Sequence, residues 1–316
     1  MTISGFTMVR NATKYYYPIK QAIASILPLV DEFVVALGDC DTDDRTLEEI
    51  GSIGSDKIRI IHTTWDLEKY PRGMEHAHQT DIAKEACKGD WLFYVQSDEV
   101  VHEEDLPRIR QRCEELLHDS SVEGLLFKYR HFWGDYDHHI TSHAWYANEI
   151  RIVRNDKDIH SWESAQSFRR IPGFDGVHYR QKEGTFKLKV ARVDAHINHY
   201  GWVRPPQYMQ KKRKAFEIIH RGRERAEEIF RNEQRQEQEG FDFGDLSQLS
   251  VYRGTHPAVM QERIRLFNWA DQLERRRHKQ PVRHKHERFK YRLLTFIEQT
   301  FLGGRQILSF KNYRLK

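Results

Sequence analysis

An apolar segment that ends in two carboxylates constrains the fold of this chain more than any other feature. From Gly89 to Glu99 the sequence reads Gly-Asp-Trp-Leu-Phe-Tyr-Val-Gln-Ser-Asp-Glu, and residues 91–95 have the composition of a buried strand. Ligands of open α/β sheets bind outside the carboxyl ends of the strands. A carboxylate there, Asp98 above all, is well placed to hold a divalent cation that bridges a diphosphate.

Expected strands and helices alternate along the chain before this segment. Residues 3–9, 33–37 and 58–61 are apolar and strand-like, while residues 17–29, 46–53 and 73–87 have helical spacing. This alternation is typical of βαβ units. We therefore predict an α/β fold in which helices flank a Rossmann-like, mostly parallel sheet. Residues 206 to about 238 read as one long, charged helix.

Several short motifs occur in a characteristic order in the first part of the chain. They are Met8-Val9-Arg10-Asn11, the strand 34–39, the turn Asp43-Asp44-Arg45-Thr46, the helix 77–86, Gly89-Asp90-Trp91 and the segment Asn198-His199-Tyr200-Gly201-Trp202. In this order they resemble the family 2 glycosyltransferases of the GT-A fold. The resemblance covers roughly residues 1–205 and implies inverting sugar transfer from a nucleotide-sugar donor.

The resemblance also implies a divalent cation, Mn²⁺ or Mg²⁺. The family usually carries Asp-x-Asp after the acid-tipped strand, whereas this chain has Gln96-Ser97-Asp98-Glu99. The acid that binds the metal in the family is kept as Asp98, and His199 is the expected further ligand.

The same resemblance assigns roles to other residues. Glu163 follows an Arg-x-x-Arg-Asn run and is the expected catalytic base, with Glu149 and Asp175 as alternatives. Turn, salt-bridge and core-packing roles are the structural alternatives for the remaining residues. We expect the donor to be bound by Arg10, Asp39, Asp41, Asp43, Gln79, Gln96 and Asp98, and the acceptor by Glu99, Trp133 and Trp162.

Composition places limits on the setting. The sequence contains no run of the roughly 20 apolar residues that a membrane helix needs. Three cysteines without Cys-x-x-Cys spacing favour a reduced, cytoplasmic protein without a zinc site. We predict a catalytic domain at residues 1–205 and a helical, basic region at residues 206–316.

Positive charge is concentrated at the end of the chain. Residues 273–316 contain thirteen Lys and Arg but three Asp and Glu, while the whole chain has a net charge of +4. Apolar residues at near-helical spacing accompany these charges, as in amphipathic helices that lie on membranes. Peripheral contact with the inner face of a membrane is one interpretation. A terminal helix packed on the core is the other, and nucleic-acid binding has the least support.

The expected partners are a nucleotide-sugar, with UDP favoured, and a saccharide or lipid-linked glycan acceptor. Two other functions stay open. A nucleotidyltransferase would need a glycine-rich loop after the first strand, and residues 10–14 contain no glycine. A degenerate, non-catalytic GT-A protein that binds glycans or acts as a scaffold would explain the loss of acid at Gln96.

Overall fold

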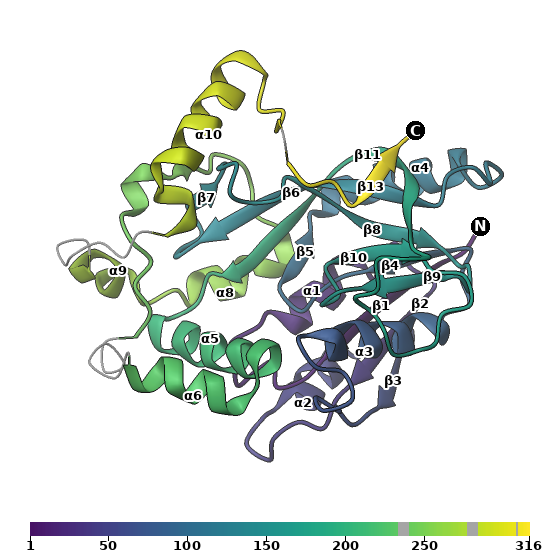
Figure 1. The fold of residues 1–316 in the computed structure, drawn as a ribbon, viewed down its shortest axis with the longest axis horizontal. Helices are drawn as coiled ribbons and strands as arrows, with labels where there is room; N and C mark the ends of the chain where they lie inside the picture. Colours follow the sequence, from purple (N-terminus) through teal and green to yellow (C-terminus); the bar gives the residue numbers. More distant parts are fainter. Residues whose placement is uncertain (233–239, 277–283, 308) are drawn as a thin grey trace.

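The computed structural model describes residues 1–232, 240–276, 284–307 and 309–316 (Figure 1). The helices are α1 Ile19–Ile26, α2 Thr46–Gly51, α3 Met74–Glu85, α4 Leu106–Glu115, α5 Pro206–Arg221, α6 Arg223–Asn232, α8 Gln261–Arg265, α9 Ala270–Arg276 and α10 Phe289–Phe301. The strands are β1 Ile3–Val9, β2 Glu32–Leu37, β3 Ile58–His62, β4 Trp91–Tyr94, β5 Glu99–Val101, β6 Gly124–Trp133, β7 His138–Ile140, β8 Asn148–Arg154, β9 Ile159–Trp162, β10 Ser167–Arg170, β11 Phe186–Trp202, β12 Ser250–Val251 and β13 Tyr313–Leu315.

The strands form a mixed sheet in the order β3-β2-β1-β4-β8-β6-β11-β10-β9. Strands β1 to β4 pair in parallel, but β4 with β8, β8 with β6, and β11 with β10 pair antiparallel. The prediction of a mostly parallel sheet is therefore wrong for the second half of the sheet. One reason is that short connections join several later strands. The four-residue turn between β9 and β10 allows antiparallel pairing alone, because parallel strands need a long crossover.

Helices cover both faces of the parallel half. Alternating side chains of β2 separate two clusters, because successive residues of a strand point to opposite faces. Phe33 and Val35 pack with α1 and α4, whereas Val34 and Ala36 pack with α3. The order in which strands are added reverses next to β1, because β2 and β3 lie on one side of β1 and β4 lies on the other. Ligand sites of such sheets lie at this switch point.

The C-terminal third packs against the antiparallel half. Trp269 and Met260 share a buried cluster with Trp133 and Tyr200 of the preceding region. The expected long helix is broken at Gly222, whose φ of 84° lies outside the helical region, and α6 packs back against α5. The predicted boundary at residue 205 stays a prediction.

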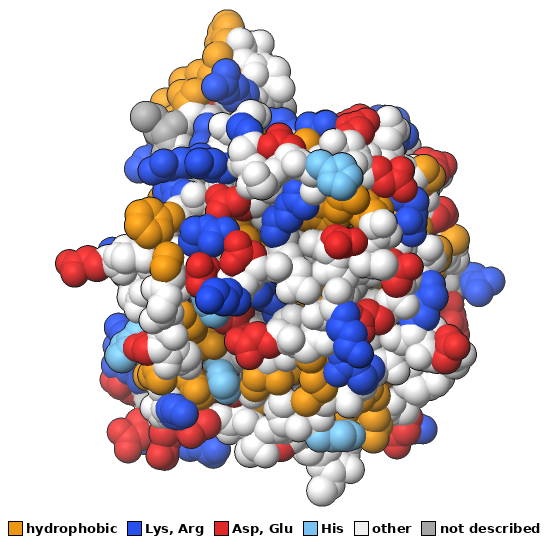
Figure 2. Space-filling view, turned by 90° about the vertical axis from the view of Figure 1, so that its right-hand side faces the viewer, with side chains coloured by type: hydrophobic (Ala, Val, Ile, Leu, Met, Phe, Trp, Pro, Cys, Tyr) orange, Lys and Arg blue, Asp and Glu red, His pale blue; other side chains and the backbone are white. Residues whose placement is uncertain are grey.

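Helix α10 projects from this body. It lies at the top of Figure 1, and the corresponding protrusion in Figure 2 carries hydrophobic and basic side chains. Among the described residues, no helix has both the length and the apolar content to cross a membrane.

Candidate active site

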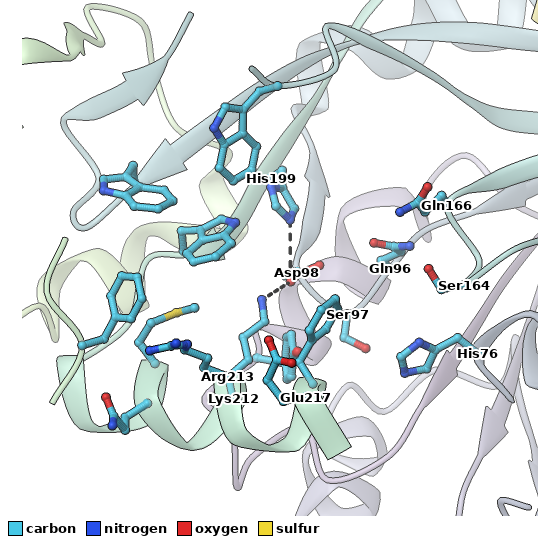
Figure 3. A pocket seen from close by; sticks show the side chains of 18 of the residues that line it. His76, Gln96, Ser97, Asp98, Ser164, Gln166, His199, Lys212, Arg213 and Glu217 are labelled. Carbon is cyan, nitrogen blue, oxygen red and sulfur yellow. Dashed lines mark hydrogen bonds and ion pairs between the residues drawn. The ribbon is translucent and has the colours of Figure 1, made fainter. Parts of the chain in front are cut away.

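A cavity of about 1070 Å³ lies outside the carboxyl ends of β1 and β4 (Figure 3). Arg10 follows β1, and Gln96, Ser97 and Asp98 follow β4, so both ends of the switch point contribute to its wall. Helix α5 forms the opposite wall with Lys212 and other residues. The position is the one at which open α/β sheets bind ligands.

Asp98 lies among cations at the centre of this cavity. Its Oδ2 is 3.3 Å from Lys212 Nζ and 4.0 Å from an Arg204 guanidinium nitrogen. Burial raises the pKa of the Asp98 carboxyl, but Lys212, His199 and Arg204 outweigh this effect and leave it below its ordinary value. Burial also lowers the pKa of Lys212 to about 7. Asp98 therefore carries a negative charge at neutral pH.

Strand register brings His199 next to Asp98. Strand β5 pairs antiparallel with β11, with Glu99 opposite His199, and β6 pairs in parallel with β11, with His131 opposite His199. The Nε2 atom of His199 lies 3.7 Å from Asp98 Oδ2. The pairing of β5, β6 and β11 thus brings Asp98, His131 and His199 together, although they are far apart in the sequence.

Hydrogen bonds determine which nitrogen of His199 carries the proton. His131 Nε2 lies 2.8 Å from the Tyr146 carbonyl oxygen, which accepts only, so this nitrogen is the donor. Burial lowers the pKa of His131 to about 3, so its ring is neutral and Nδ1 is an acceptor. His199 Nδ1, 3.0 Å away, must then donate to it. Burial also lowers the pKa of His199, so its ring is neutral and Nε2 presents a lone pair toward Asp98.

A carboxylate oxygen and an imidazole lone pair that face each other suit a divalent cation. The space beside them is open because residue 201 is glycine: a Cβ there would lie 2.6 Å from Asp98 Oδ2 and would also clash with His199 Nε2. No group of three or more His, Cys, Asp or Glu side chains suited to a metal occurs within the described part of the chain. The two residues present fit a cation whose other ligands come from a bound molecule.

Glu99 and Gln96 have different surroundings. Glu99 is fully buried, and both of its carboxylate oxygens accept hydrogen bonds from Arg151, at 2.8 Å each. Tyr129 donates a further hydrogen bond to Glu99. Gln96 lines the cavity, and its side chain donates to the Ala165 carbonyl oxygen at 2.9 Å. Glu99 thus lies in the interior beneath residues 96–98 and does not line the cavity.

The predicted donor residues separate into two groups. Arg10 lines the cavity and donates from Nε to the Asp39 carbonyl oxygen at 3.0 Å, so Asp39 lies directly behind it. Asp41 and Asp43 both pair with Lys14, away from the cavity wall. Of these four residues, only Arg10 lines the cavity, and Asp39 holds its guanidinium from behind.

Gln79 lies behind the cavity wall. It is fully buried on α3, where it donates to Glu75 at 2.7 Å and accepts from Thr63. These hydrogen bonds hold the Gln79 side chain in the interior, and Gln79 does not line the cavity.

The predicted base Glu163 does not line the cavity, although its neighbours Ser164 and Gln166 do. It lies in the turn between β9 and β10 with a φ of +58°, and Ala165 shares this conformation. Left-handed backbone at non-glycine residues is costly and occurs often at functional sites. Trp162, beside it, is buried under Arg169 and also lies outside the cavity.

Aromatic residues form one end of the cavity. Trp133 stacks on Trp202 with ring centroids 4.5 Å apart, and Trp145 packs edge-on against both. Phe241 completes this group. Trp133, which the sequence predicts to contact the acceptor, lines this end of the cavity together with Trp145 and Trp202, and its acceptor role stays a prediction.

Sequence reasoning missed several residues of the site: Lys212 and Glu217, which line the cavity, and His131, which lies behind His199. Lys212 reads as one of many charges on a surface helix, and His131 as part of an aromatic stretch. Pro205-Pro206 signals the start of α5, but one sequence does not tell which face of that helix turns toward Asp98. Glu217, on the same wall one turn further, was missed for the same reason.

Comparisons with known proteins give partial matches. No family model and no curated protein matches the chain. A structure of TarS from S. aureus is 15% identical, with a TM-score of 0.40, over 73% of this chain and 42% of that one. Glucosyl-3-phosphoglycerate synthase from Mycobacterium tuberculosis, in complex with Mn²⁺, uridine diphosphate and phosphoglyceric acid, is 21% identical, with a TM-score of 0.27, over 42% of this chain and 43% of that one. These matches span less than half of either protein's length.

Proposed function

We propose that the chain is a metal-assisted glycosyltransferase that uses a nucleotide-sugar donor. The observation that carries the proposal is the facing pair of Asp98 Oδ2 and His199 Nε2, in a cavity at the switch point that Arg10 and Lys212 also line. A nucleotide diphosphate is the ligand class that matches such a site, because its oxygens complete the ligands of a cation and its remaining charge meets Arg and Lys side chains. Among nucleotides, we expect UDP to be preferred.

Asp98 and His199 would hold the divalent cation, Mn²⁺ or Mg²⁺. When bound, the cation would neutralise charge on the departing diphosphate. The Lys212 amine already lies beside Asp98 and donates to the Gly201 carbonyl oxygen, 2.7 Å away, and a bound diphosphate would favour its charged form. In this proposal Lys212 and Arg10 share the diphosphate charge with the cation.

Inverting transfer needs a carboxylate that accepts the proton of the acceptor hydroxyl while its oxygen forms the bond to the anomeric carbon and the diphosphate leaves. Glu163 is the base that the sequence predicts, and the strained turn around it borders the cavity. Glu217 is the alternative that the cavity wall supplies; its carboxylate pairs with Arg221 at 2.7 Å. The variants Glu163→Gln and Glu217→Gln distinguish the two candidates. Replacement of the true base should lower kcat by about 100-fold or more with little change in donor affinity.

The acceptor end is proposed to be the tryptophan group around Trp133. A saccharide or a lipid-linked glycan presents ring faces that stack on indoles. The predicted acceptor roles of Glu99 and Trp162 are not part of this proposal, because both residues are buried away from the cavity.

Calorimetry with UDP, GDP, dTDP and CMP tests the proposal, with and without Mn²⁺. We expect one nucleotide to bind in an Mn²⁺-dependent manner to the wild type, and this binding to be lost in Asp98→Asn. Asp56→Asn is the matched control, since Asp56 is an exposed carboxylate on the turn before β3. Absence of nucleotide binding under every condition would overturn the proposal.

A non-catalytic binding protein is the second candidate. The observation that favours it is that Asp98 is paired with Lys212 and that Gln96 supplies no charge. It predicts nucleotide or glycan binding without release of nucleotide from any nucleotide-sugar, so a turnover assay on the bound donor separates the two candidates.

A further inference from the structure

Helix α10 is amphipathic, but one apolar face of it points away from the body of the protein. Phe289, Leu293 and Phe296 follow at i, i+4 and i+7 and so share one face, and they are 80%, 47% and 60% exposed. A surface helix ordinarily buries its apolar face. The face formed by Phe289, Leu293 and Phe296 is therefore not packed on the body, whereas Tyr291, Leu294 and Ile297 of the same helix are half-buried.

The side of α10 that contacts the body carries two hydrogen-bonding residues, Glu298 and Thr295, beside the half-buried Tyr291 and Leu294. Glu298 is 1% exposed and lies 2.6 Å from His143 Nδ1. Thr295 accepts a hydrogen bond from the His143 backbone N–H at 2.9 Å. Glu298 also accepts from the backbone N–H of Ile307, just after the helix. These hydrogen bonds hold the helix with its phenylalanines outward.

The exposed side of the helix is basic as well as apolar. Lys290 and Arg292 flank the apolar face on its two sides and are exposed. Residues 288–316 contain seven Lys and Arg and a single acid, Glu298, which is buried against His143. Phe301, just after this face, is 71% exposed, and Phe310, further along the chain, 74%. Figure 2 shows orange and blue atoms together on this protrusion.

We propose that α10 docks the protein on an anionic lipid bilayer surface. Apolar side chains that enter the interface, with cations on both flanks at the level of the headgroups, are the features of interfacial helices. An acidic protein would match the charges but not five exposed large apolar groups, Phe289, Leu293, Phe296, Phe301 and Phe310. A second copy of this chain would bring the same positive charge and be repelled by it.

The cavity would then open near the membrane. His284, Lys285 and His286 line the cavity, and α10 begins three residues later. The docking itself does not depend on the proposed transferase activity. Residues 277–283, which belong to the basic segment noted in the sequence, lie outside the described residues.

Vesicle co-sedimentation tests the proposal with the full chain. We expect binding to vesicles of phosphatidylcholine mixed with phosphatidylglycerol, at least about tenfold weaker binding to phosphatidylcholine alone, and weakening at about 0.5 M NaCl. The double variant Phe289→Ser/Phe296→Ser should lose binding about tenfold or more. Leu47→Ser is the matched control, because Leu47 is 47% exposed on α2, at the other end of the molecule.

Lys290→Glu/Arg292→Glu gives a second readout, since it should remove the preference for anionic vesicles while the unfolding transition stays in place. Failure of the wild type to bind either vesicle would overturn the proposal. So would a dimer in sedimentation velocity that the double Phe variant dissociates without any lipid binding. Nucleotide calorimetry on the same variants should be unchanged, so failure here is distinguishable from failure of the proposed function.

Discussion

His131 and His199 are joined by a hydrogen bond between their two Nδ1 atoms, 3.0 Å apart. Since the Tyr146 carbonyl oxygen accepts from His131 Nε2, the bond assigns the proton to His199 and leaves His199 Nε2 free to accept. His131 does not line the cavity, yet it determines which nitrogen of His199 is available to a ligand.

Replacing His131 with Phe removes this control with little change in ring size. His199 could then take either tautomer, and loss of such a supporting partner typically weakens metal affinity by about 10–100-fold. Titration of Mn²⁺ followed by electron paramagnetic resonance, in the presence of the bound nucleotide, measures the change. An unchanged Mn²⁺ affinity in a folded variant would contradict the assignment of His199 as a ligand.

Removing the Asp98 charge should destabilise the fold. In Asp98→Asn the buried cations Lys212 and Arg204 lose their carboxylate partner, which we expect to cost about 3 kcal/mol. Adding Lys212→Met should recover part of this loss, with a coupling free energy of about 1–3 kcal/mol. Urea denaturation of both single variants and of the double variant closes the cycle, and strictly additive effects would contradict the pairing.

The Glu99–Arg151 pair should be more important for stability than for ligand binding. Arg151→Met leaves the Glu99 carboxylate buried with one hydroxyl and one backbone donor, Tyr129 and Gln96, so we expect a loss of about 3–5 kcal/mol. Arg151→Lys should rescue little, because an ammonium does not make the two parallel bonds of the guanidinium. Thermal and urea unfolding measure both variants; near-wild-type stability of Arg151→Met would show that the pair contributes nothing net.

Glu75 should make stability depend on pH. Burial raises its pKa from 4.5 to about 7, so the folded state keeps the proton over a range in which the unfolded chain has lost it. The contribution of Glu75 is present below pH 4.5 and is lost as pH rises toward 7. At about 1.36 kcal/mol per pKa unit, the loss amounts to about 3 kcal/mol.

Glu75→Gln keeps the shape of the side chain but does not titrate. We expect the difference in unfolding free energy between the variant and the wild type to move in favour of the variant by up to about 3 kcal/mol between pH 4.5 and 8. Urea denaturation at a series of pH values checks this. A difference that is constant with pH would show that Glu75 titrates normally.

The sequence predicted the parallel half of the fold well, because the information there is local. Strand β2 alternates its buried side chains between two faces, and this alternation can be seen in consecutive residues of the sequence. Asp98 was predicted as a site residue in the same way, since it follows an apolar strand, and the structure places it in the cavity. His199 came from the resemblance, through the motif around Tyr200 and Gly201.

The remaining site residues could not be predicted, because they depend on long-range pairing. Lys212 reaches Asp98 across 114 positions of the chain. Gln79 and Glu99 were predicted to contact donor and acceptor, but their side chains are buried, where they hydrogen bond to Glu75 and Arg151. Side-chain direction depends on the register of neighbouring elements, and a single sequence does not specify that register.

By itself, then, the amino-acid sequence determined where strands end in acid and where charge accumulates, because both are properties of consecutive residues. The tertiary structure alone decided which of these features meet. Parallel pairing of β6 with β11 set His131 against His199, and hydrogen bonds from His143 turned the phenylalanines of α10 outward. The physical reason is that these contacts form between segments more than 60 residues apart, whose distance and orientation arise only when the whole sheet assembles.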